Sequence, residues 1–221
     1  MQPRRPGQQQ PHPDLEAIVR NHLDAPWRRP IADHSAQAFA EIRHRVETSG
    51  RSLILDSCCG TGDSTRYLAA TYPQALVVGV DKSASRLSRR RSGDHDPDAA
   101  DNYVLVRADV NDFWRLAADA GWRPERHFLL YPNPYPKASQ LRKRWYGSPA
   151  FAALIDLGGQ LTVRTNWGLY AEEFVLALQA AGFHASQQVL ANPTLITAFE
   201  TKYFERGHDL YELVSDLNRR C

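Results

Sequence analysis

The sequence predicts a single α/β domain with a doubly wound, mostly parallel sheet. From residue 51 onward, short aliphatic runs alternate with helical stretches, which is the pattern of consecutive βαβ units. The length of 221 residues suits one large domain, and the 43% hydrophobic and 24% charged residues are close to the values of globular proteins. We therefore expect one hydrophobic core around a sheet of ordinary width.

The segments before residue 51 are expected to precede the sheet. Residues 1–13 contain four prolines and four glutamines, so they are expected to be a disordered tail that buries no apolar surface. Residues 14–50 are expected to form two N-terminal helices. Asp14 is placed to cap the first of them and Ser35 the second. Residues 51–221 then make up the main domain.

The main domain divides into alternating elements. Strands are expected at residues 52–56, 75–81, 103–108, 127–131, 160–165, 184–190 and 208–214. Helices are expected between them at residues 63–72, 83–91, 110–120, 149–157 and 169–181.

The charge balance does not by itself indicate a nucleic-acid binder. The 27 basic and 25 acidic residues leave a net charge of only +2, so contact with phosphate would have to come from local basic clusters. Such a cluster is often only a solvated face. The clusters are Arg28 with Arg29, Arg86 with Arg89, Arg90 and Arg91, and Arg142 with Lys143 and Arg144.

The cysteines favour a reducing, cytoplasmic setting. Cys58, Cys59 and Cys221 have neither the spacing of a zinc site nor that of a disulfide framework, so no metal is expected. No segment has the apolar length needed to cross a bilayer. We expect no membrane partner, and a monomer or a weak homodimer.

A glycine turn follows the first predicted strand. The run LILDSCCGTGD places Asp56 at the end of the strand and Gly60 and Gly62 in the turn, where glycine allows the backbone to approach a ligand. The second strand ends in Asp81. An acid there is placed to hydrogen-bond the ribose hydroxyls of an adenosine-containing cofactor.

The sequence of this turn distinguishes between two adenosine-containing cofactors, NAD and S-adenosylmethionine. A dinucleotide site has the pattern G-x-G-x-x-G to receive pyrophosphate, whereas this turn offers Cys58, Gly60 and Gly62, which favours S-adenosylmethionine. The third strand leads into Asp109, where a methyltransferase would hold the adenine amino group. Asp109 could equally be the cap of the helix that follows it.

The fourth predicted strand begins the run HFLLYPNPYPK at residues 127–137, and three prolines stiffen the end of this run. Proline fixes the backbone there, so Asn133, Tyr135 and Lys137 are expected to be presented to a ligand. Asn133 also suits a plain turn, because it precedes a proline.

This run and two later segments resemble, in order, the bacterial tRNA (guanine-N7)-methyltransferase family. YPNPYPK at residues 131–137 is similar to its Phe-Pro-Asp-Pro-Trp-Pro-Lys segment. TNWGLYAEEF at residues 165–174 resembles its Thr-Asp-Trp-x-x-Tyr-Ala segment, and residues 197–213 resemble its Thr-x-Phe-Glu segment followed by Gly-His. The resemblance spans roughly residues 35–214.

The resemblance implies a Rossmann-like class I methyltransferase, with a mostly parallel seven-stranded sheet and an antiparallel last strand. It implies S-adenosylmethionine as cofactor, tRNA as partner and methylation of guanine N7 in the variable loop. The implied cofactor contacts are Asp56, Gly60, Gly62, Asp81, Asp109 and Asn133. The implied catalytic residues are Asn133, Lys137 and Asn166, and the implied substrate contacts are Lys137, Asn166, Thr197 and Glu200. Arg142, Lys143 and Arg144 follow the proline run, so we expect them to contact RNA beside the mouth of the site. Glu200 would accept from N1–H and the exocyclic amine of guanine.

The chain departs from the family pattern at several positions. Asn133 and Asn166 stand where the family has aspartates, Ala198 replaces a lysine, and Cys58 replaces a glycine. Asn166 also suits a helix cap. Guanine N7 carries an in-plane lone pair and needs no general base. The amides of Asn133 and Asn166 could therefore support methyl transfer by positioning the guanine alone. Two alternatives stay open, a methyltransferase with another RNA or a small molecule as acceptor, and a homologue that binds cofactor or RNA without turnover.

Overall fold

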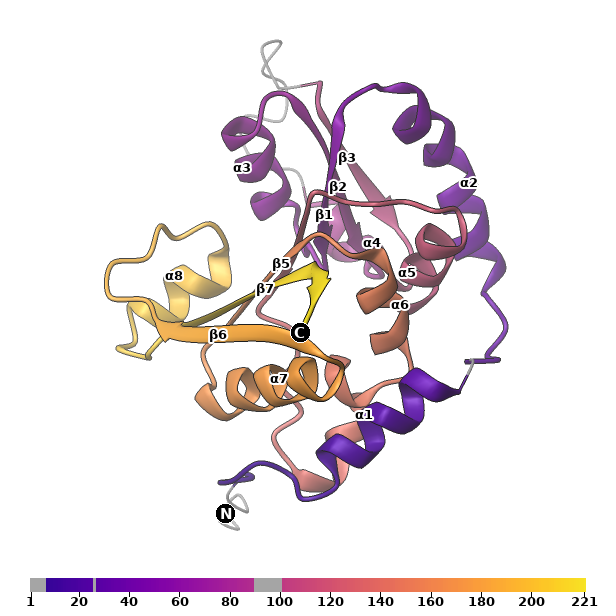
Figure 1. Cartoon of the computed structure of the whole chain (residues 1–221). Coiled ribbons are helices and arrows are strands. Elements are labelled where there is room, and N and C mark those ends of the chain that lie inside the picture. Colours follow the sequence, from indigo (N-terminus) through magenta and orange to yellow (C-terminus); the bar gives the residue numbers. More distant parts are fainter. Residues whose placement is uncertain (1–6, 26, 90–100) are drawn as a thin grey trace.

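A seven-stranded sheet organises the chain, in the spatial order β3-β2-β1-β4-β5-β7-β6 (Figure 1). The computed structural model describes residues 7–25, 27–89 and 101–221. The strands are β1 (Ser52–Ser57), β2 (Ala75–Asp81), β3 (Tyr103–Arg107), β4 (Arg126–Leu130), β5 (Gln160–Thr165), β6 (Phe183–Val189) and β7 (Tyr211–Arg220). β1 to β5 pair in parallel, and β7 runs antiparallel between β5 and β6. The predicted fold class is confirmed.

The winding of the sheet determines where a ligand can bind. β1 lies between β2 and β4, so the chain winds outward from β1 first in one direction and then in the other. Connections that leave β1 and β4 therefore diverge at their carboxyl ends, and such a switch point opens a crevice at the edge of the sheet.

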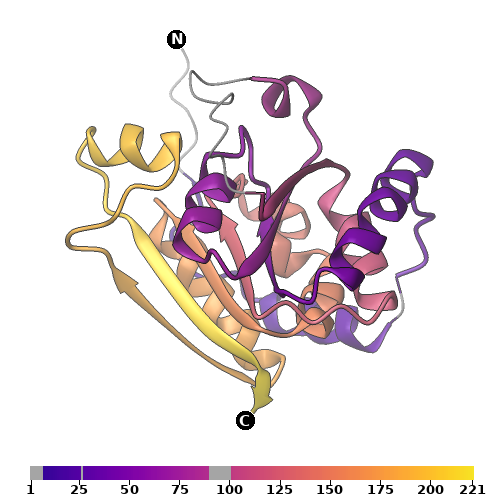
Figure 2. The same cartoon turned by 90° about the horizontal axis from the view of Figure 1, so that it is seen from above.

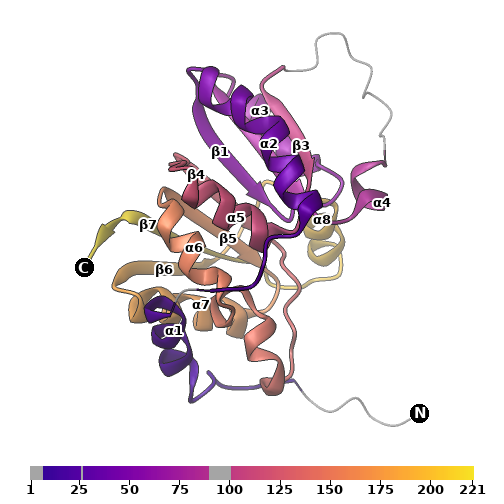
Figure 3. The same ribbon diagram turned by 90° about the vertical axis from the view of Figure 1, so that its right-hand side faces the viewer.

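Helices cover the two faces unequally. α1 (Leu15–Asp24), α2 (Asp33–Thr48), α5 (Val110–Asp119), α6 (Ala150–Leu157) and α7 (Gly168–Ala180) share one hydrophobic core on one face. Figure 3 shows α2, α5, α6 and α7 along that side. α3 (Asp63–Thr71) packs through Leu68 and Ala69 on the other face.

Shorter elements lie in the connections. They are α4 (Ala84–Leu87), α8 (Ala198–Phe204) and two 3-10 helices, Ala138–Lys143 and Trp145–Gly147. α8 belongs to residues 190–210, which join β6 to β7 and extend to one side of the sheet (Figures 1 and 2). We call residues 190–210 the arm. The expected helix at 83–91 is the short α4, and Arg90 and Arg91 lie outside the described residues.

Two expected helix caps are not formed by the side chains assigned to them. α2 begins at Asp33, and Ser35 lies inside it, where its hydroxyl accepts from the N–H of Asp109 (3.1 Å). Asp14 is at the start of α1 without a side-chain capping bond. The serine instead ties the beginning of α2 to the end of β3, which no local pattern reveals.

Residues 7–13 are packed against the domain, so the expectation of disorder is wrong for them, and the part of that prediction on residues 1–6 lies outside the described residues. The N–H of Gln8 donates to the carbonyl of Pro136 (2.9 Å), and its side-chain amide donates to Glu173 (2.6 Å). The N–H of His12 donates to the same carboxylate (2.8 Å). Polar contacts with distant residues hold this segment, and composition alone does not reveal them.

No helix within residues 7–25, 27–89 and 101–221 has both the length and the apolar character needed to cross a membrane.

Candidate active site

A cavity of about 750 Å³ opens at the carboxyl ends of the parallel strands, where the switch point predicts a ligand. Each connection that leaves this edge contributes to its lining. The lining includes Cys58, Cys59 and Gly60 after β1, Asp81 and Lys82 after β2, Asp109 and Asn111 after β3, Tyr131, Asn133 and Tyr135 after β4, Asn166 after β5, and Thr197, Phe199, Lys202 and Tyr203 from the arm.

The two glycines of the turn have different roles. Gly60 has a φ of +62° and open space where a side chain would stand, and it lines the cavity. Gly62 has a φ of +81°, and a Cβ there would lie 2.8 Å from Leu105 Cδ1. Gly62 therefore allows the start of α3 to pack against β3, and the structure does not bring it to the cavity wall as the resemblance implied.

Cys58 lines the cavity in an unfavourable backbone conformation. Its φ of 64° lies in the left-handed region, which costs about 1–2 kcal/mol for a residue with a Cβ. Burial first, and then the nearby Asp81 and Asp56, raise the pKa of its thiol to about 12. The thiol is therefore neutral at physiological pH and is not a nucleophile.

Asp81 is held in place with acceptor capacity to spare. The N–H groups of Gly60 and Ser83 donate to its two oxygens at 3.1 and 2.8 Å, and Arg86 approaches to 3.2 Å. A carboxylate can accept about four hydrogen bonds. A ribose hydroxyl could therefore still donate to Asp81, while the open space beside Gly60 suits the backbone approach of a nucleoside cofactor.

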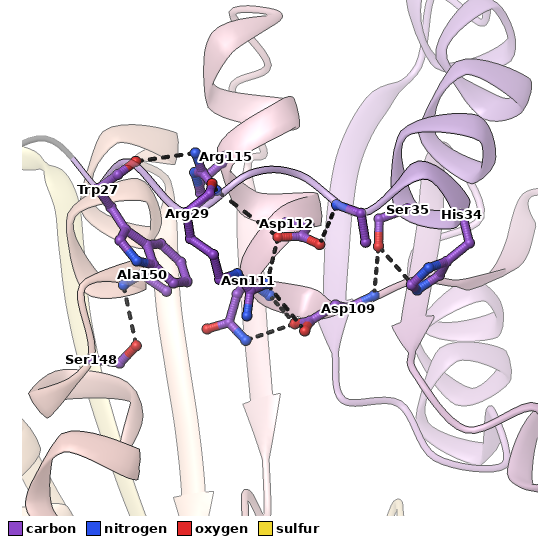
Figure 4. A network of polar contacts seen from close by, with 11 residues as sticks. Trp27, Arg29, His34, Ser35, Asp109, Asn111, Asp112, Arg115, Ser148 and Ala150 are labelled. Atoms are coloured by element: carbon purple, nitrogen blue, oxygen red, sulfur yellow. Dashed lines mark hydrogen bonds and ion pairs between the residues drawn. The ribbon is translucent and has the colours of Figure 1, made fainter.

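Asp109 caps α5 and also lines the cavity, while its contact with adenine stays a prediction. Its Oδ1 accepts from the N–H of Asn111 (2.9 Å), and Arg29 approaches Oδ2 to 3.3 Å (Figure 4). Burial opposes ionisation, but these hydrogen bonds and the positive charge of Arg29 outweigh it and lower the pKa of Asp109. Arg29 also pairs with Asp112 (2.6 Å). Arg29, one member of the first basic cluster, is thus paired with two carboxylates.

Asp56 does not line the cavity, contrary to its implied role as a cofactor contact. It is fully buried, and its Oδ2 accepts from the hydroxyls of Ser64 and Thr65, both at 2.6 Å. Burial raises the pKa of Asp56 to about 6 despite these hydrogen bonds. Asp56 fixes the first turn of α3 against β1.

The proline loop, residues 131–137, has a strained backbone. Tyr131 and Tyr135 have φ values of 51° and 46°, which residues other than glycine rarely adopt. Asn133 forms the expected turn, with its side-chain oxygen 3.4 Å from the N–H of Tyr135, and it also lines the cavity. Strain of this kind clusters at functional sites. Lys137 belongs to this loop but does not line the cavity.

Asn166 lines the cavity and does not cap α7. Its amide lies 3.5 Å from Nδ1 of His208, while the residue at the N-cap of α7 is Trp167. Thr197 is the side-chain cap of α8, and it also borders the cavity.

Glu200 is structural, so its implied contact with guanine is wrong in this structure. It is fully buried, it pairs with Arg164 (2.8 Å), and it accepts from the N–H groups of Ile196 and Thr197 at 2.6 and 2.9 Å. Arg164 also pairs with Glu212 of β7 (2.8 Å). Glu200 therefore anchors the arm to the sheet.

The basic cluster at residues 142–144 is divided by the fold. Lys143 is exposed and lines the cavity, and Arg142 is exposed but does not. Arg144 is fully buried and pairs with Glu173, so it cannot contact RNA. Among the described residues, the cations that line the cavity are Lys82, Arg86, Arg89, Lys143 and Lys202.

Sequence reasoning missed the aromatic side chains that the arm brings to the cavity, Phe199 and Tyr203. Phe199 was visible as part of the Thr-x-Phe-Glu segment, but nothing local in the sequence indicated that α8 would form or turn toward the glycine loop.

Comparison with known proteins gives a consistent result. Residues 50–213 match a family model described as "Putative methyltransferase". A tRNA (guanine-N(7)-)-methyltransferase of Saccharophagus degradans is 27% identical over 185 residues, covering 76% of this chain and 78% of that protein. One of Acidithiobacillus ferrooxidans is 26% identical over 215 residues, covering 89% and 90%. A trans-aconitate 2-methyltransferase of Methylobacterium nodulans is 34% identical over 178 residues, covering 72% and 68%.

Solved structures share the fold. The 16S rRNA methyltransferase KamB is similar with a TM-score of 0.59 at 17% identity, covering 85% of this chain and 94% of that one. An antibiotic-related methyltransferase reaches 0.56 at 16% identity, covering 80% and 92%.

Proposed function

The chain belongs to the methyltransferase family that its residues 50–213 match, and on that premise we propose that it is an S-adenosylmethionine-dependent tRNA (guanine-N7)-methyltransferase. The observation that supports this most is the meeting of three distant segments at one cavity. Asn133, Asn166 and Thr197 belong to the three segments that resemble the tRNA enzymes, and all three border the cavity that Gly60 and Asp81 also line.

The cofactor half of the proposal depends on the connections after β1, β2 and β3. Asp81 would accept from the ribose hydroxyls, Gly60 would leave room for the cofactor beside the backbone, and Asp109 would lie near the adenine. When bound, S-adenosylmethionine supplies a methyl group on a sulfonium, and its thioether is the leaving group. Neutral Cys58 offers no competing nucleophile to that methyl group.

The acceptor half depends on the proline loop, Asn166 and the arm. The lone pair of guanine N7 forms the new C–N bond without losing a proton, so the site needs no base. Its side chains would instead hold the base in line with the methyl group and stabilise the cationic ring that results. Asn133 and Asn166 can accept hydrogen bonds through their side-chain oxygens without adding charge.

A small-molecule acceptor is the second candidate. The relative from Methylobacterium nodulans carries the name trans-aconitate 2-methyltransferase, and the cations Lys82, Lys143 and Lys202 at the cavity could pair with a carboxylate as well as with phosphate. A cytoplasmic setting and a monomer or weak homodimer remain predictions.

The test is methyl transfer from radiolabelled S-adenosylmethionine to unmodified tRNA transcripts, followed by digestion and nucleoside analysis. We expect label in N7-methylguanosine for a wild-type transcript and none when adenine replaces the acceptor guanine in the variable loop. A parallel reaction contains trans-aconitate and no RNA. Label in the acid alone would support the second candidate, and cofactor binding without label in either acceptor would support the non-catalytic alternative.

A further inference from the structure

Three aromatic rings stack in series from the proline loop to the surface of the arm. The rings of Tyr131 and Tyr203 have centroids 6.2 Å apart and planes 25° apart. Tyr203 and Phe199 follow at 6.4 Å and 23°. These separations fall within the range of favourable aromatic pairs. All three rings line the cavity, and we call them the ladder.

The ladder ends in solvent. Tyr131 and Tyr203 are half-buried, whereas Phe199 is 49% exposed. Phe204, on the same helix, is 46% exposed, but it neither lines the cavity nor belongs to the ladder. An exposed apolar ring at the rim of the cavity leaves a face that another flat group could cover.

The base of the arm is fixed, so the outermost ring is presented in a defined position. Arg164 on β5 pairs with Glu200 at 2.8 Å and with Glu212 at 2.8 Å, which joins α8 to two neighbouring strands. Thr197 caps α8 through the N–H of Glu200 (3.1 Å). A ring held in this way loses little conformational freedom when a ligand stacks on it.

We propose that the ladder is a stacking platform for the nucleobase next to the acceptor base in a single-stranded RNA loop. This rests on the proposed function, because it presumes an RNA acceptor. Every base has a π-face, so stacking on Phe199 would tolerate sequence variation. Lys202, three residues along α8, and Lys143 also line the cavity and could pair with the phosphates between the two bases.

The experiment compares Phe199→Leu, Phe199→Trp and Phe204→Leu. Phe204→Leu is the matched control, since it makes the same change on the same helix at similar exposure, away from the cavity. Four quantities are measured: Kd for a tRNA transcript at several salt concentrations, KM and kcat for methyl transfer, and the emission of 2-aminopurine placed on either side of the acceptor nucleotide.

We expect Phe199→Leu to raise Kd and KM for tRNA by about fivefold to a hundredfold, the loss typical of one base–aromatic stack. The slope of log Kd against log salt should stay the same, because no phosphate contact is removed. Wild type and Phe199→Trp should quench 2-aminopurine at one of the two positions, and Phe199→Leu should not. Phe204→Leu should behave as wild type.

Equal effects of Phe199→Leu and Phe204→Leu would overturn the platform while leaving the proposed function intact. The same holds if Phe199→Leu binds and methylates tRNA as wild type does. If the wild-type protein binds no tRNA but still binds S-adenosylmethionine, both the platform and the RNA acceptor are wrong.

Discussion

Asn133 and Asn166 line the cavity as neutral amides, at positions where the family that the sequence resembles has aspartates. Methylation at N7 leaves a positive charge on guanine, and a carboxylate placed near it would stabilise the transition state more than an amide does. If tRNA is the acceptor, Asn133→Asp and Asn166→Asp should each raise kcat, on the order of tenfold to a hundredfold. The half-buried Asn166 should give the larger gain, because water screens the exposed Asn133 more strongly.

The measurement is the single-turnover rate of label transfer into N7-methylguanosine. Asn192→Asp, an exposed change outside the cavity, adds the same charge and should leave the rate unchanged. A lower rate in both cavity variants would mean that the amides belong to a site suited to a different acceptor.

His127 is a buried imidazole that makes folding sensitive to acid. It is fully buried in β4, its Nε2 lies 2.8 Å from the hydroxyl of Ser57, and burial lowers its pKa from 6.5 to about 3. The unfolded chain therefore takes up a proton near pH 6.5 that the folded protein refuses until about pH 3. The stability that depends on neutral His127 is complete above pH 6.5 and declines by up to about 1.4 kcal/mol per pH unit below it.

His127→Gln should flatten this decline, as measured by urea unfolding between pH 7 and pH 4. Asp56 acts in the opposite sense, because its raised pKa of about 6 makes protonation below that value favour the folded state. Because Asp56 is present in both proteins, its contribution cancels in the difference in unfolding free energy between His127→Gln and wild type at each pH. His44→Gln, at an exposed position on α2, should leave the pH dependence as it is in wild type. Parallel curves for wild type and His127→Gln would show that His127 is not the acid-sensitive group.

At the scale of elements, a buried polar hub holds the proline loop. Arg144 donates to the carbonyl oxygens of Tyr135 (3.0 Å) and Lys137 (3.2 Å), and Gln8 donates to that of Pro136, between them. Arg144 in turn pairs with Glu173. The strained loop is thus fixed by α7 and by the segment before α1.

Breaking the hub from one side should cost much stability. Arg144→Met leaves the Glu173 carboxylate buried without its cation, which should lower the free energy of unfolding by about 3–5 kcal/mol. The double variant Arg144→Met with Glu173→Met should lose less than the sum of the two single variants. Urea unfolding of all four proteins completes the cycle, and strict additivity would mean that the two side chains are not coupled.

The sequence predicted the strands better than it predicted the contacts. Residues 75–81 and 160–165 have the predicted bounds because strand formation follows from the local aliphatic pattern. Asp81, Asn133 and Asn166 line the cavity because each ends a parallel strand or lies within three residues of its carboxyl end, and parallel strands end at one edge.

The predictions that failed depended on long-range partners. Asp56, Glu200 and Arg144 are the residue types expected at a ligand site, but each is buried against hydroxyls or an opposite charge. Which polar side chain is buried depends on partners that lie from eight to more than thirty positions away in the chain. The resemblance therefore assigned Asp56 and Glu200 to ligands, and the basic cluster assigned Arg144 to RNA.

At the scale of the whole molecule, we expect tRNA binding to depend more on the positive side chains at the cavity than on the net charge of +2. Lys143 lines the cavity and its neighbour Arg142 does not, although both are exposed. Lys143→Ala should weaken tRNA binding and reduce the slope of log Kd against log salt by about one, whereas Arg142→Ala should change both much less. The measurement is a filter-binding titration at several salt concentrations. The reverse ranking would move the RNA-binding surface away from the cavity.

The position of β7 has a consequence for the order in which the chain can fold as it leaves the ribosome. Within the described part of the chain, β6 pairs with β7 alone, and residues 190–210 separate the two strands. β6 therefore emerges without a partner strand and can pair only after residues 211–220 have been synthesised. β1 to β5 can pair with one another before that. Glu212, which helps to fix Arg164 beneath the arm, arrives with the same segment. The half of the cavity formed by β1, β2 and β3 can thus take shape during translation, and the arm is anchored only afterwards.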